Sequence, residues 1–267
     1  MIDGSTRVFA ILGDPVAHSL SPHMHNAAFR VSGIRAVYVP FSCSATDVPT
    51  LIQVIAGAGG GGNVTVPHKE LAAASVDVCL EVARTVGACN TFWGENGGSS
   101  GDNTDVHGLL EALHALKAPS APWLIAGTGG AARAAVIAAK EAGVEVAVSS
   151  RDDGRRRQFE SWASSQGVAV VPATDCRVLI NSTPLGLKAS DPIPIPVDAA
   201  PRAEVAFDMV YAVGETEWVR AMRPRVRCAS DGRTMLVAQG AAAFERWFPG
   251  KRAPLEVMRA AVNAALR

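Results

Sequence analysis

The sequence predicts an α/β fold in which strands and helices alternate around a doubly wound parallel sheet. From Val106 onward, short apolar runs alternate with helical patterns in a β-α-β-α-β order. A glycine-rich turn at 127–132 joins one of these strands to an alanine-rich helix. The 267 residues are 48% hydrophobic, with 25 glycines and 16 prolines. A chain of this length and composition is sufficient for one large domain or two ordinary ones.

The first half of the chain alternates between apolar strand-like runs and helical patterns. Ser21 is the expected N-cap of the first helix, Pro22 its first residue, and Gly33 ends it. The Gly/Ser-rich stretch Gly94–Gly101 is expected to form a loop. The predicted elements are strand Arg7–Leu12, helix Pro22–Ser32, strand Ala36–Phe41, helix Val48–Ala56, strand Asn63–Val66, helix Pro67–Ala74 and strand Ala88–Trp93.

A second series of elements begins near Val106 and is interrupted by a Pro-Ser-Ala-Pro break at 119–122. The proline-rich stretch that starts at Asp191 is expected to be a loop. The predicted elements are helix Val106–Leu116, strand Trp123–Ala126, helix Ala131–Ala142, strands Val144–Ser149, Val168–Val171, Val178–Asn181 and Val205–Asp208, and helices Met235–Trp247 and Pro254–Leu266.

The charge balance excludes some classes of partner. Acidic and basic side chains number 25 each, so the net charge is zero. This argues against nucleic acid or an anionic membrane as a partner. No apolar run reaches bilayer-spanning length, and the start MIDGSTR does not resemble a signal peptide. The five scattered cysteines indicate buried thiols in a reducing compartment. We therefore expect a soluble, cytoplasmic protein.

The turn WLIAGTGGAA, 123–132, carries a nucleotide-binding pattern. Gly127, Gly129, Gly130 and Ala131 fall in a GxGxxG/A motif between a predicted strand and a predicted helix, which is the context that the motif requires. Glycine lets the backbone approach a pyrophosphate, and the helix N-terminus favours its negative charge. A tight turn without a ligand is the alternative, but the flanking strands favour a dinucleotide.

The strand that follows this helix ends in a mixed charged segment. It contains Ser150, Arg151, Asp152, Asp153 and Arg155, and in a dinucleotide-binding fold it faces the adenosine ribose. Arg151 and Arg155 suit the 2′-phosphate of NADP, because their planar guanidinium groups match phosphate oxygens. An inward-pointing aspartate would instead accept from the 2′-hydroxyl of NAD. NADP is the expected cofactor, with NAD as the alternative.

Two polar segments are predicted at strand–loop–helix junctions, where small-ligand sites gather. They are GNVTVPHKE from Gly62 and GDNTD from Gly101. Reduction of a ketone needs a proton donor for the developing alkoxide. Lys69 held near Asp105 would supply the proton, with the carboxylate orienting the ammonium. A surface Lys69 and a capping Asp105 are the alternative interpretation.

The stretch HSLSPHMHN, which starts at His18, holds three of the six histidines. His23 and His25 are two positions apart on the predicted helix and point about 200° apart, so they cannot bind one ion together. We predict no metal site in this chain. Ser19 and Ser21 lie at the helix N-terminus, where backbone N–H groups and the dipole favour a carboxylate.

These segments resemble the shikimate dehydrogenase family over nearly the whole chain. The matching blocks are GDPVAHSLSPHMHNAAF from Gly13, GGNVTVPHKE from Gly61, GACNT from Gly87, GDNTD from Gly101, GTGGAARAA from Gly127, INSTPLGL from Ile180, FDMVYAVGET from Phe207 and DGRTMLVAQGAAAFERW from Asp231. The resemblance implies an N-terminal α/β substrate domain, 1–105, completed by C-terminal helices at 236–267. It also implies a Rossmann-like NADP-binding domain, 106–235, with a cleft between the two.

The resemblance also implies a reaction and a set of site residues. The reaction is reversible NADPH-dependent reduction of 3-dehydroshikimate to shikimate, on the route to chorismate and the aromatic amino acids. Lys69 and Asp105 would carry the acid–base work. The implied substrate contacts are Ser19 and Ser21 to the carboxylate, Asn63, Thr65, Asn90 and Gln239 to ring hydroxyls, and Tyr211. The expected cofactor contacts are Gly127, Gly129, Gly130, Ala131, Ser150, Arg151, Arg155, Asn181, Thr183 and Gly232.

Other functions stay open. An NAD-dependent quinate/shikimate dehydrogenase is favoured by the aspartates after Arg151. The intact Ser19 and Ser21 pair opposes it, because quinate carries an extra hydroxyl beside its carboxylate. An aminoshikimate enzyme is a further variant. A non-catalytic metabolite-binding regulator is opposed by the intact Lys69 and Asp105. We expect a small-molecule substrate as the partner, and a monomer or homodimer.

Overall fold

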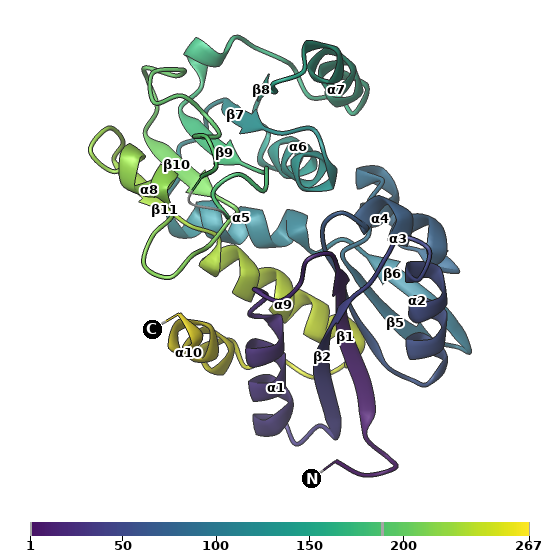
Figure 1. Ribbon diagram of the computed structural model, residues 1–267. Helices are drawn as coiled ribbons and strands as arrows, with labels where there is room; N and C mark the ends of the chain where they lie inside the picture. The colour runs from purple at the N-terminus through teal and green to yellow at the C-terminus, as the bar shows by residue number, and fades with distance from the viewer. Residues whose placement is uncertain (1, 188–189, 267) are drawn as a thin grey trace. The chain divides into compact units, whose positions relative to one another are not determined.

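The structure, a computed structural model, describes residues 2–187 and 190–266 and confirms the α/β prediction (Figure 1). The chain folds into two compact units. The first contains 2–104 and 236–265, and the second contains 105–235. Among the described residues no helix combines the length and the apolar character needed to cross a membrane. All five cysteines are free thiols, of which Cys79 and Cys228 are only half-buried.

The first unit contains a six-stranded mixed sheet in the order β2-β1-β3-β5-β6-β4. The β1 strand pairs in parallel with both β2 and β3, whereas β5 runs antiparallel to β3 and β6. The strands are β1 (Arg7–Gly13), β2 (Ala36–Ser42), β3 (Gly61–Val64), β4 (Val78–Cys79), β5 (Thr91–Glu95) and β6 (Gly98–Asp102).

Helices cover both faces of this sheet (Figure 1). An aliphatic core joins β1 and β3 to α2, through side chains such as Leu12, Val64 and Ile52. An aromatic cluster on the other face joins Phe9 of β1 to Phe29 of α1 and to Trp247 of α9, with ring centroids 5.3 and 4.9 Å from Phe9. The helices are α1 (Ser21–Val31), α2 (Val48–Gly57), α3 (Lys69–Ser75), α4 (Glu81–Val86), α9 (Arg233–Trp247) and α10 (Leu255–Ala265).

Glycine is required where β3 passes between its neighbours. A Cβ atom at Gly62 would overlap the backbone carbonyl oxygen of Ala10 in β1. A Cβ at Gly61 would lie 2.5 Å from the carbonyl oxygen of Phe92 in β5. Such distances are below van der Waals contact, so the glycine run lets three strands pack closely. It thereby fixes the strand that carries Asn63.

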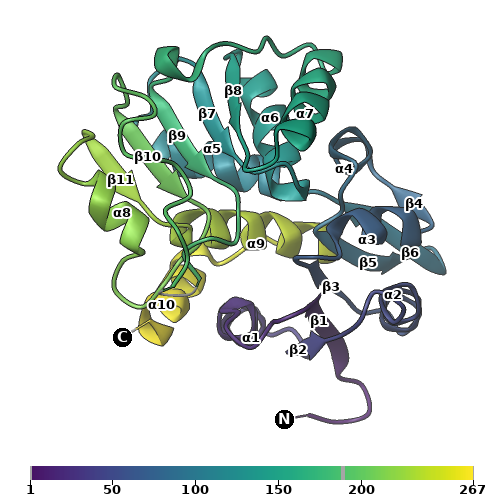
Figure 2. The same cartoon turned by 45° about the horizontal axis from the view of Figure 1, so that its top comes forward.

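The second unit contains a five-stranded parallel sheet in the order β11-β10-β9-β7-β8 (Figure 2). Its strands are β7 (Trp123–Ala126), β8 (Val146–Ser149), β9 (Val178–Asn181), β10 (Val205–Asp208) and β11 (Cys228–Ser230). Its helices are α5 (Asp105–Ala115), α6 (Gly130–Ala142), α7 (Asp153–Ser165), the short 3₁₀ helix η1 (Ala173–Asp175) and α8 (Glu217–Met222). The strand order reverses at β7, since β8 pairs on one side of it and β9 on the other. Ligands of doubly wound sheets bind beyond the carboxyl ends of the strands at such a point.

Several sequence predictions are wrong in detail. The stretch predicted as a loop at Gly94–Gly101 instead contains the end of β5 and most of β6. Asn96 and Gly97, with φ of 51° and 80°, form the connection between these strands, and Asn-Gly is a strong hairpin signal that the glycine and serine content obscured. The predicted strand Val168–Val171 is reduced to a single bridge between Val146 and Val170, because Pro172 follows and cannot donate to a sheet.

Candidate functional site

Three of the expected substrate contacts in the first unit form one buried hydrogen-bonded network. Asn63 donates from Nδ2 to the Asn90 carbonyl oxygen at 3.1 Å. Asn90 in turn donates from its own Nδ2 to Gln239 Oε1 at 3.3 Å and to Thr104 Oγ1 at 3.0 Å. The Thr104 backbone N–H donates to Asn90 Oδ1 at 2.7 Å. These contacts join β3, the loop before β5, the loop after β6, and α9, and they fix the orientation of each amide.

Lys69 is the first residue of α3 and is half-buried. Its position is set by two neighbouring contacts. The Lys69 carbonyl oxygen accepts the backbone N–H of Cys89 at 2.8 Å, which places the start of α3 next to the loop that carries Asn90. The buried ring of His68 is hydrogen-bonded through Nε2 to the Cys43 carbonyl oxygen at 2.8 Å. The backbone at Lys69 is therefore held from both sides.

The two serines lie at the start of α1, but the prediction that Ser21 is the N-cap is wrong. Ser21 is the first helical residue and Leu20 occupies the N-cap position. The Ser21 side chain is buried. The half-buried Ser19 accepts the Ser21 backbone N–H on its Oγ at 3.3 Å. Both hydroxyls lie near the helix N-terminus, as a carboxylate site needs.

Thr65, another expected substrate contact, follows β3 and is half-buried. Its backbone N–H donates to the Leu12 carbonyl oxygen at 2.8 Å, and its carbonyl oxygen accepts from His68 at 2.9 Å. A side chain at Gly13 would overlap the Thr65 methyl group. The glycine of the GDP turn therefore lets Thr65 lie against the end of β1.

Asp105 belongs to the second unit, where it is the first residue of α5 and 4% exposed. It directly follows Thr104 of the amide network. A carboxylate in the first turn of a helix is stabilised by the orphan N–H groups there. Asp105 is therefore held at the junction where the chain passes from one unit to the other.

The glycine turn lies at the switch point of the second sheet. Gly127 follows β7 with φ of 109°, a conformation that glycine adopts readily, and a Cβ there would lie 2.8 Å from Ser182 Oγ beyond β9. Around Gly129 a Cβ would meet nothing within 4 Å, and α6 begins at the next residue. An open backbone turn leading into a helix N-terminus fits the pyrophosphate of a dinucleotide. The expected cofactor residues Gly127, Gly129, Gly130 and Ala131 all belong to this turn.

The charged segment after β8 is arranged by the start of α7. Asp152 is the N-cap of α7, and its Oδ1 accepts the backbone N–H of Arg155 at 2.9 Å. This hydrogen bond lowers the pKa of Asp152. The side chain of Arg155 also lies 3.9 Å from the same carboxylate. Arg151 and Arg155 are exposed, while Ser150 is half-buried at the strand end.

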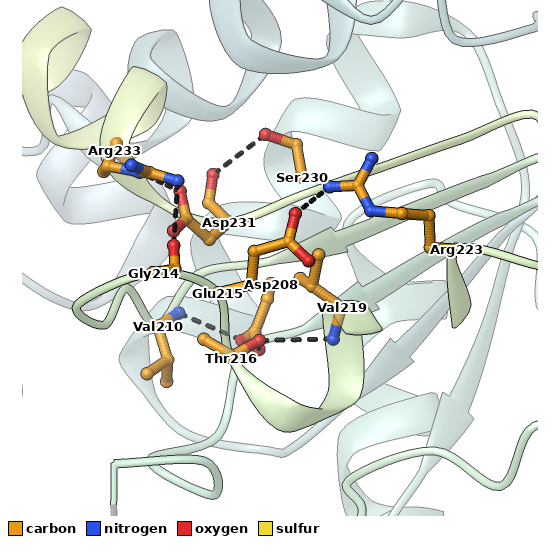
Figure 3. Close-up of polar contacts among 10 residues, drawn as sticks. All are labelled: Asp208, Val210, Gly214, Glu215, Thr216, Val219, Arg223, Ser230, Asp231 and Arg233. Carbon is orange, nitrogen blue, oxygen red and sulfur yellow. Dashed lines mark hydrogen bonds and ion pairs between the residues drawn. The ribbon is translucent and has the colours of Figure 1, made fainter. Parts of the chain in front are cut away.

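Asp208, at the end of β10, connects two loops that the sequence assigns to the cofactor and substrate. It is fully buried, and its carboxylate accepts a hydrogen bond from Asn181 Nδ2 at 2.8 Å. It also accepts from the Val210 N–H at 3.0 Å and from Thr216 Oγ1 at 2.7 Å (Figure 3). Burial raises the pKa of Asp208 to about 6, against these hydrogen bonds. The contacts fix the loop after β9 and the loop that carries Tyr211.

Asn181, which is hydrogen-bonded to Asp208, also holds Thr183 in place. Its Oδ1 accepts both the Thr183 backbone N–H at 3.0 Å and the Thr183 hydroxyl at 2.7 Å. Near Gly232, the Asp231 carboxylate pairs with Arg233 at 2.8 Å, and Arg233 donates to the Gly214 carbonyl oxygen at 3.3 Å (Figure 3). A Cβ at Gly232 would overlap the Met209 carbonyl oxygen, so glycine lets the two segments meet.

The sequence reasoning missed Thr104, Asp208 and Tyr38, which hold the expected contacts in place. Thr104 lies inside the polar GDNTD segment, and Asp208 is the one charged residue of a predicted apolar strand, at its carboxyl end. An ionisable group at that end of a parallel strand is a recognisable signal. Tyr38 alternates with apolar residues in β2 and carries no such signal.

Family models match segments near both ends of the chain, and known relatives match nearly all of it. The model for the shikimate dehydrogenase substrate binding domain matches residues 11–92, and the model for the shikimate 5'-dehydrogenase C-terminal domain matches residues 232–262. The NADP(+) shikimate dehydrogenase of Synechocystis is 36% identical over 98% of this chain and 96% of its own length. The chain belongs to the shikimate dehydrogenase family.

Solved members of the shikimate dehydrogenase family share this fold. The Thermus thermophilus enzyme, crystallised with NADP(H) and shikimate, superposes with a TM-score of 0.88 at 36% identity, over 97% of this chain and all of that one. The Listeria monocytogenes enzyme, crystallised with shikimate and NAD, gives a TM-score of 0.84 at 26% identity, over 97% of each chain. Family members have thus been crystallised with either nicotinamide dinucleotide.

Proposed function

We propose that this chain is a shikimate dehydrogenase that catalyses the reversible NADP-dependent reduction of 3-dehydroshikimate to shikimate. The observation that carries the proposal is the near-complete match to NADP(+) shikimate dehydrogenases, such as that of Synechocystis over 98% of the chain. The buried network of Asn63, Asn90 and Gln239 supports it, because fixed amides suit a small polyhydroxylated substrate.

We assign the proton transfer to Lys69 and Asp105. The Lys69 ammonium donates a proton from Nζ to the alkoxide that develops as the ketone is reduced, and takes it back in shikimate oxidation. Asp105 orients the ammonium and balances its charge. The half-buried position of Lys69 suits this role, since partial exclusion of water strengthens such interactions.

The remaining polar residues bind and orient the substrate. Ser19 and Ser21 hold its carboxylate at the start of α1. The substrate's ring hydroxyls are bound by Asn63, Thr65, Asn90 and Gln239, and Tyr211 contributes from the loop after β10. This division follows the family resemblance. Except for Gln239, which lies within α9, these residues lie near strand ends or at the start of α1.

The second unit binds the dinucleotide. When bound, NADP supplies or accepts the hydride. Gly127, Gly129, Gly130 and Ala131 of the turn would hold the pyrophosphate. Asn181 and Thr183 would lie near the nicotinamide, and Gly232 would be a further cofactor contact. Ser150, Arg151 and Arg155 would hold the adenosine 2′-phosphate. The Asp152 carboxylate accepts from the helix backbone, which supports NADP at this end.

The proposal also covers the cellular location and the oligomeric state of the protein. We place the enzyme in the cytoplasm, where its five free thiols suit a reducing environment. We expect a monomer or a homodimer, to be settled by light scattering of the purified protein.

Initial rates of nicotinamide reduction test the function. The panel is shikimate and quinate, each with NADP and with NAD. A dominant rate with shikimate and NADP supports the proposal. A dominant rate with quinate and NAD would instead support the NAD-dependent quinate/shikimate dehydrogenase. No reaction with any pair would favour the non-catalytic metabolite-binding regulator.

Replacement of the proposed proton donor tests the mechanism. Lys69→Ala is expected to lower kcat by about 10²–10⁴-fold while shikimate still binds, because general acid–base catalysis contributes roughly that factor. Stopped-flow rates and calorimetric binding measure the two effects. Lys140→Ala, an exposed lysine on α6, is the matched control and should behave as wild type. Near-normal turnover of Lys69→Ala would contradict the assignment.

A further inference from the structure

Tyr38 is hydrogen-bonded to Asn63, a proposed substrate-binding residue. Its hydroxyl donates to Asn63 Oδ1 at 2.8 Å, and the two side chains are only 1% and 4% exposed. On the other end of the amide, Asn63 Nδ2 donates to the Asn90 carbonyl oxygen at 3.1 Å. A carbonyl oxygen can only accept, so the amide nitrogen must face Asn90 and the amide oxygen must face Tyr38.

These two bonds determine what Asn63 can offer a ligand. Each end of the amide has one fixed protein partner, which leaves one N–H and one lone pair of Oδ1. Without the tyrosine hydroxyl the amide would keep only the Asn90 bond and could rotate about its last torsion. Binding would then have to order a mobile side chain, which weakens the complex.

Tyr38 is itself held by the end of the HSLSPHMHN stretch. The Asn26 side chain accepts the Tyr38 backbone N–H at 2.9 Å and donates to the Tyr38 carbonyl oxygen at 2.8 Å. A second N–H of Asn26 reaches the Pro22 carbonyl oxygen at 2.8 Å. The ring of His25 stacks on the Tyr38 ring with centroids 4.6 Å apart and planes 21° apart. Thus α1 fixes the tyrosine in both backbone and ring.

We propose that Tyr38 is a positioning residue for shikimate binding, which fixes the Asn63 amide and is in turn held by Asn26 and His25. The inference rests on the proposed function, because it assigns Asn63 to a substrate hydroxyl. Asn63 touches the substrate, and Tyr38 acts through it. It gives the histidine and asparagine at the end of HSLSPHMHN a role without a metal.

The test is Tyr38→Phe, which removes one hydroxyl and keeps the stacked ring. We expect KM for shikimate to rise about 3- to 10-fold, as the loss of one net hydrogen bond predicts. The change in kcat should be smaller, and KM for NADP should stay at the wild-type value. An unchanged KM for shikimate would overturn the proposal.

A double-mutant cycle separates positioning from general loss of structure. In an Asn63→Ala background the hydroxyl has no amide to orient, so Tyr38→Phe should no longer change KM. An equal effect of Tyr38→Phe in both backgrounds would overturn the proposal. Asn26→Ala leaves the hydroxyl and the amide intact but releases the β2 backbone, and it should raise KM in the same direction.

Ser99→Ala is the matched control in the same unit. Ser99 is 1% exposed and donates its hydroxyl proton to Asp77 Oδ2 at 2.9 Å. The variant therefore lacks a buried hydroxyl that makes no contact with Asn63. It should lower thermal stability without changing KM for shikimate. The wild-type rate separates the two proposals. A wild-type protein that is inactive on shikimate overturns the proposed function. If the wild type is active, the double-mutant cycle decides whether Tyr38 is a positioning residue.

Discussion

The Asp152 carboxylate follows β8, and its hydrogen bonds bear on whether its charge opposes the binding of a 2′-phosphate. A carboxylate in this segment suggests repulsion of a 2′-phosphate and therefore NAD. In the structure, Asp152 Oδ1 instead accepts the Arg155 N–H at 2.9 Å and caps α7. Its negative charge is directed to the positive end of the helix dipole, which removes the objection to NADP at this position.

This geometry changes the expected result of Asp152→Ala. If the carboxylate faced the phosphate, its removal would favour NADP. Because it caps a helix, we expect the ratio of kcat/KM for NADP and NAD to change by less than about fivefold, as for other exposed charges. The melting temperature should fall. Asp153→Ala, which removes an exposed partner of Arg156, is the control, and a shift of more than tenfold toward NADP would contradict the capping role.

At the scale of elements, β3 links the sheet of the first unit to the site, because it carries both the glycine run and Asn63. The overlap that a side chain at Gly62 would create with the Ala10 carbonyl oxygen involves backbone on both sides. Backbone cannot move aside as a flexible side chain does. Glycine here maintains the strand spacing on which the position of Asn63 depends.

Gly62→Ala is therefore expected to destabilise the first unit. Overpacking in a core lowers the free energy of unfolding by roughly 1–3 kcal/mol, and KM for shikimate should rise with it. Urea unfolding and steady-state kinetics measure the two effects. Gly57→Ala, at the end of α2 where a Cβ meets nothing within 4 Å, should be neutral or slightly stabilising. Equal stability of the two variants would show that β1 and β3 can separate at no cost.

The sequence predicted many elements in which periodicity and glycine signals agree, but it missed the 13-residue helix α7. The strands Trp123–Ala126, Val178–Asn181 and Val205–Asp208 have the predicted bounds. The two-residue strand β4 and the three-residue strand β11 are too short to show a period. In the site, the motifs predicted which polar residues lie at strand ends. The bond from Tyr38 to Asn63 could not be predicted, because it depends on the pairing of β2 and β3 on either side of β1.

For the molecule as a whole, two buried groups act on stability in opposite directions as the pH falls. Burial lowers the pKa of His25 to about 3, so between about pH 6.5 and 3 only the unfolded chain takes up that proton and stability falls. Asp208 has a pKa raised to about 6. Between about pH 6 and 4 the folded chain takes up its proton first, so stability rises.

The two contributions should nearly cancel between pH 6 and 4, and single variants should expose them. Relative to wild type, Asp208→Asn should lose about 1.4 kcal/mol of unfolding free energy per pH unit on acidification in this range. His25→Leu should gain about the same slope. Asparagine is a fair substitute, since Thr216 can accept as well as donate. Urea unfolding at several pH values measures the differences, and curves parallel to wild type would contradict the pKa shifts.

The chain order of the first unit bears on how the protein is made. The aromatic cluster needs Phe9 and Phe29 from one end of the chain and Trp247 from the other. The 105–235 segment lies between them, and at ribosomal speed its synthesis takes on the order of ten seconds. Throughout that interval one face of the β1–β2–β3 sheet has no α9 to cover it. The nascent chain therefore exposes part of this apolar face until α9 is made, and exposed apolar surface of this kind favours aggregation while the second unit is being synthesised.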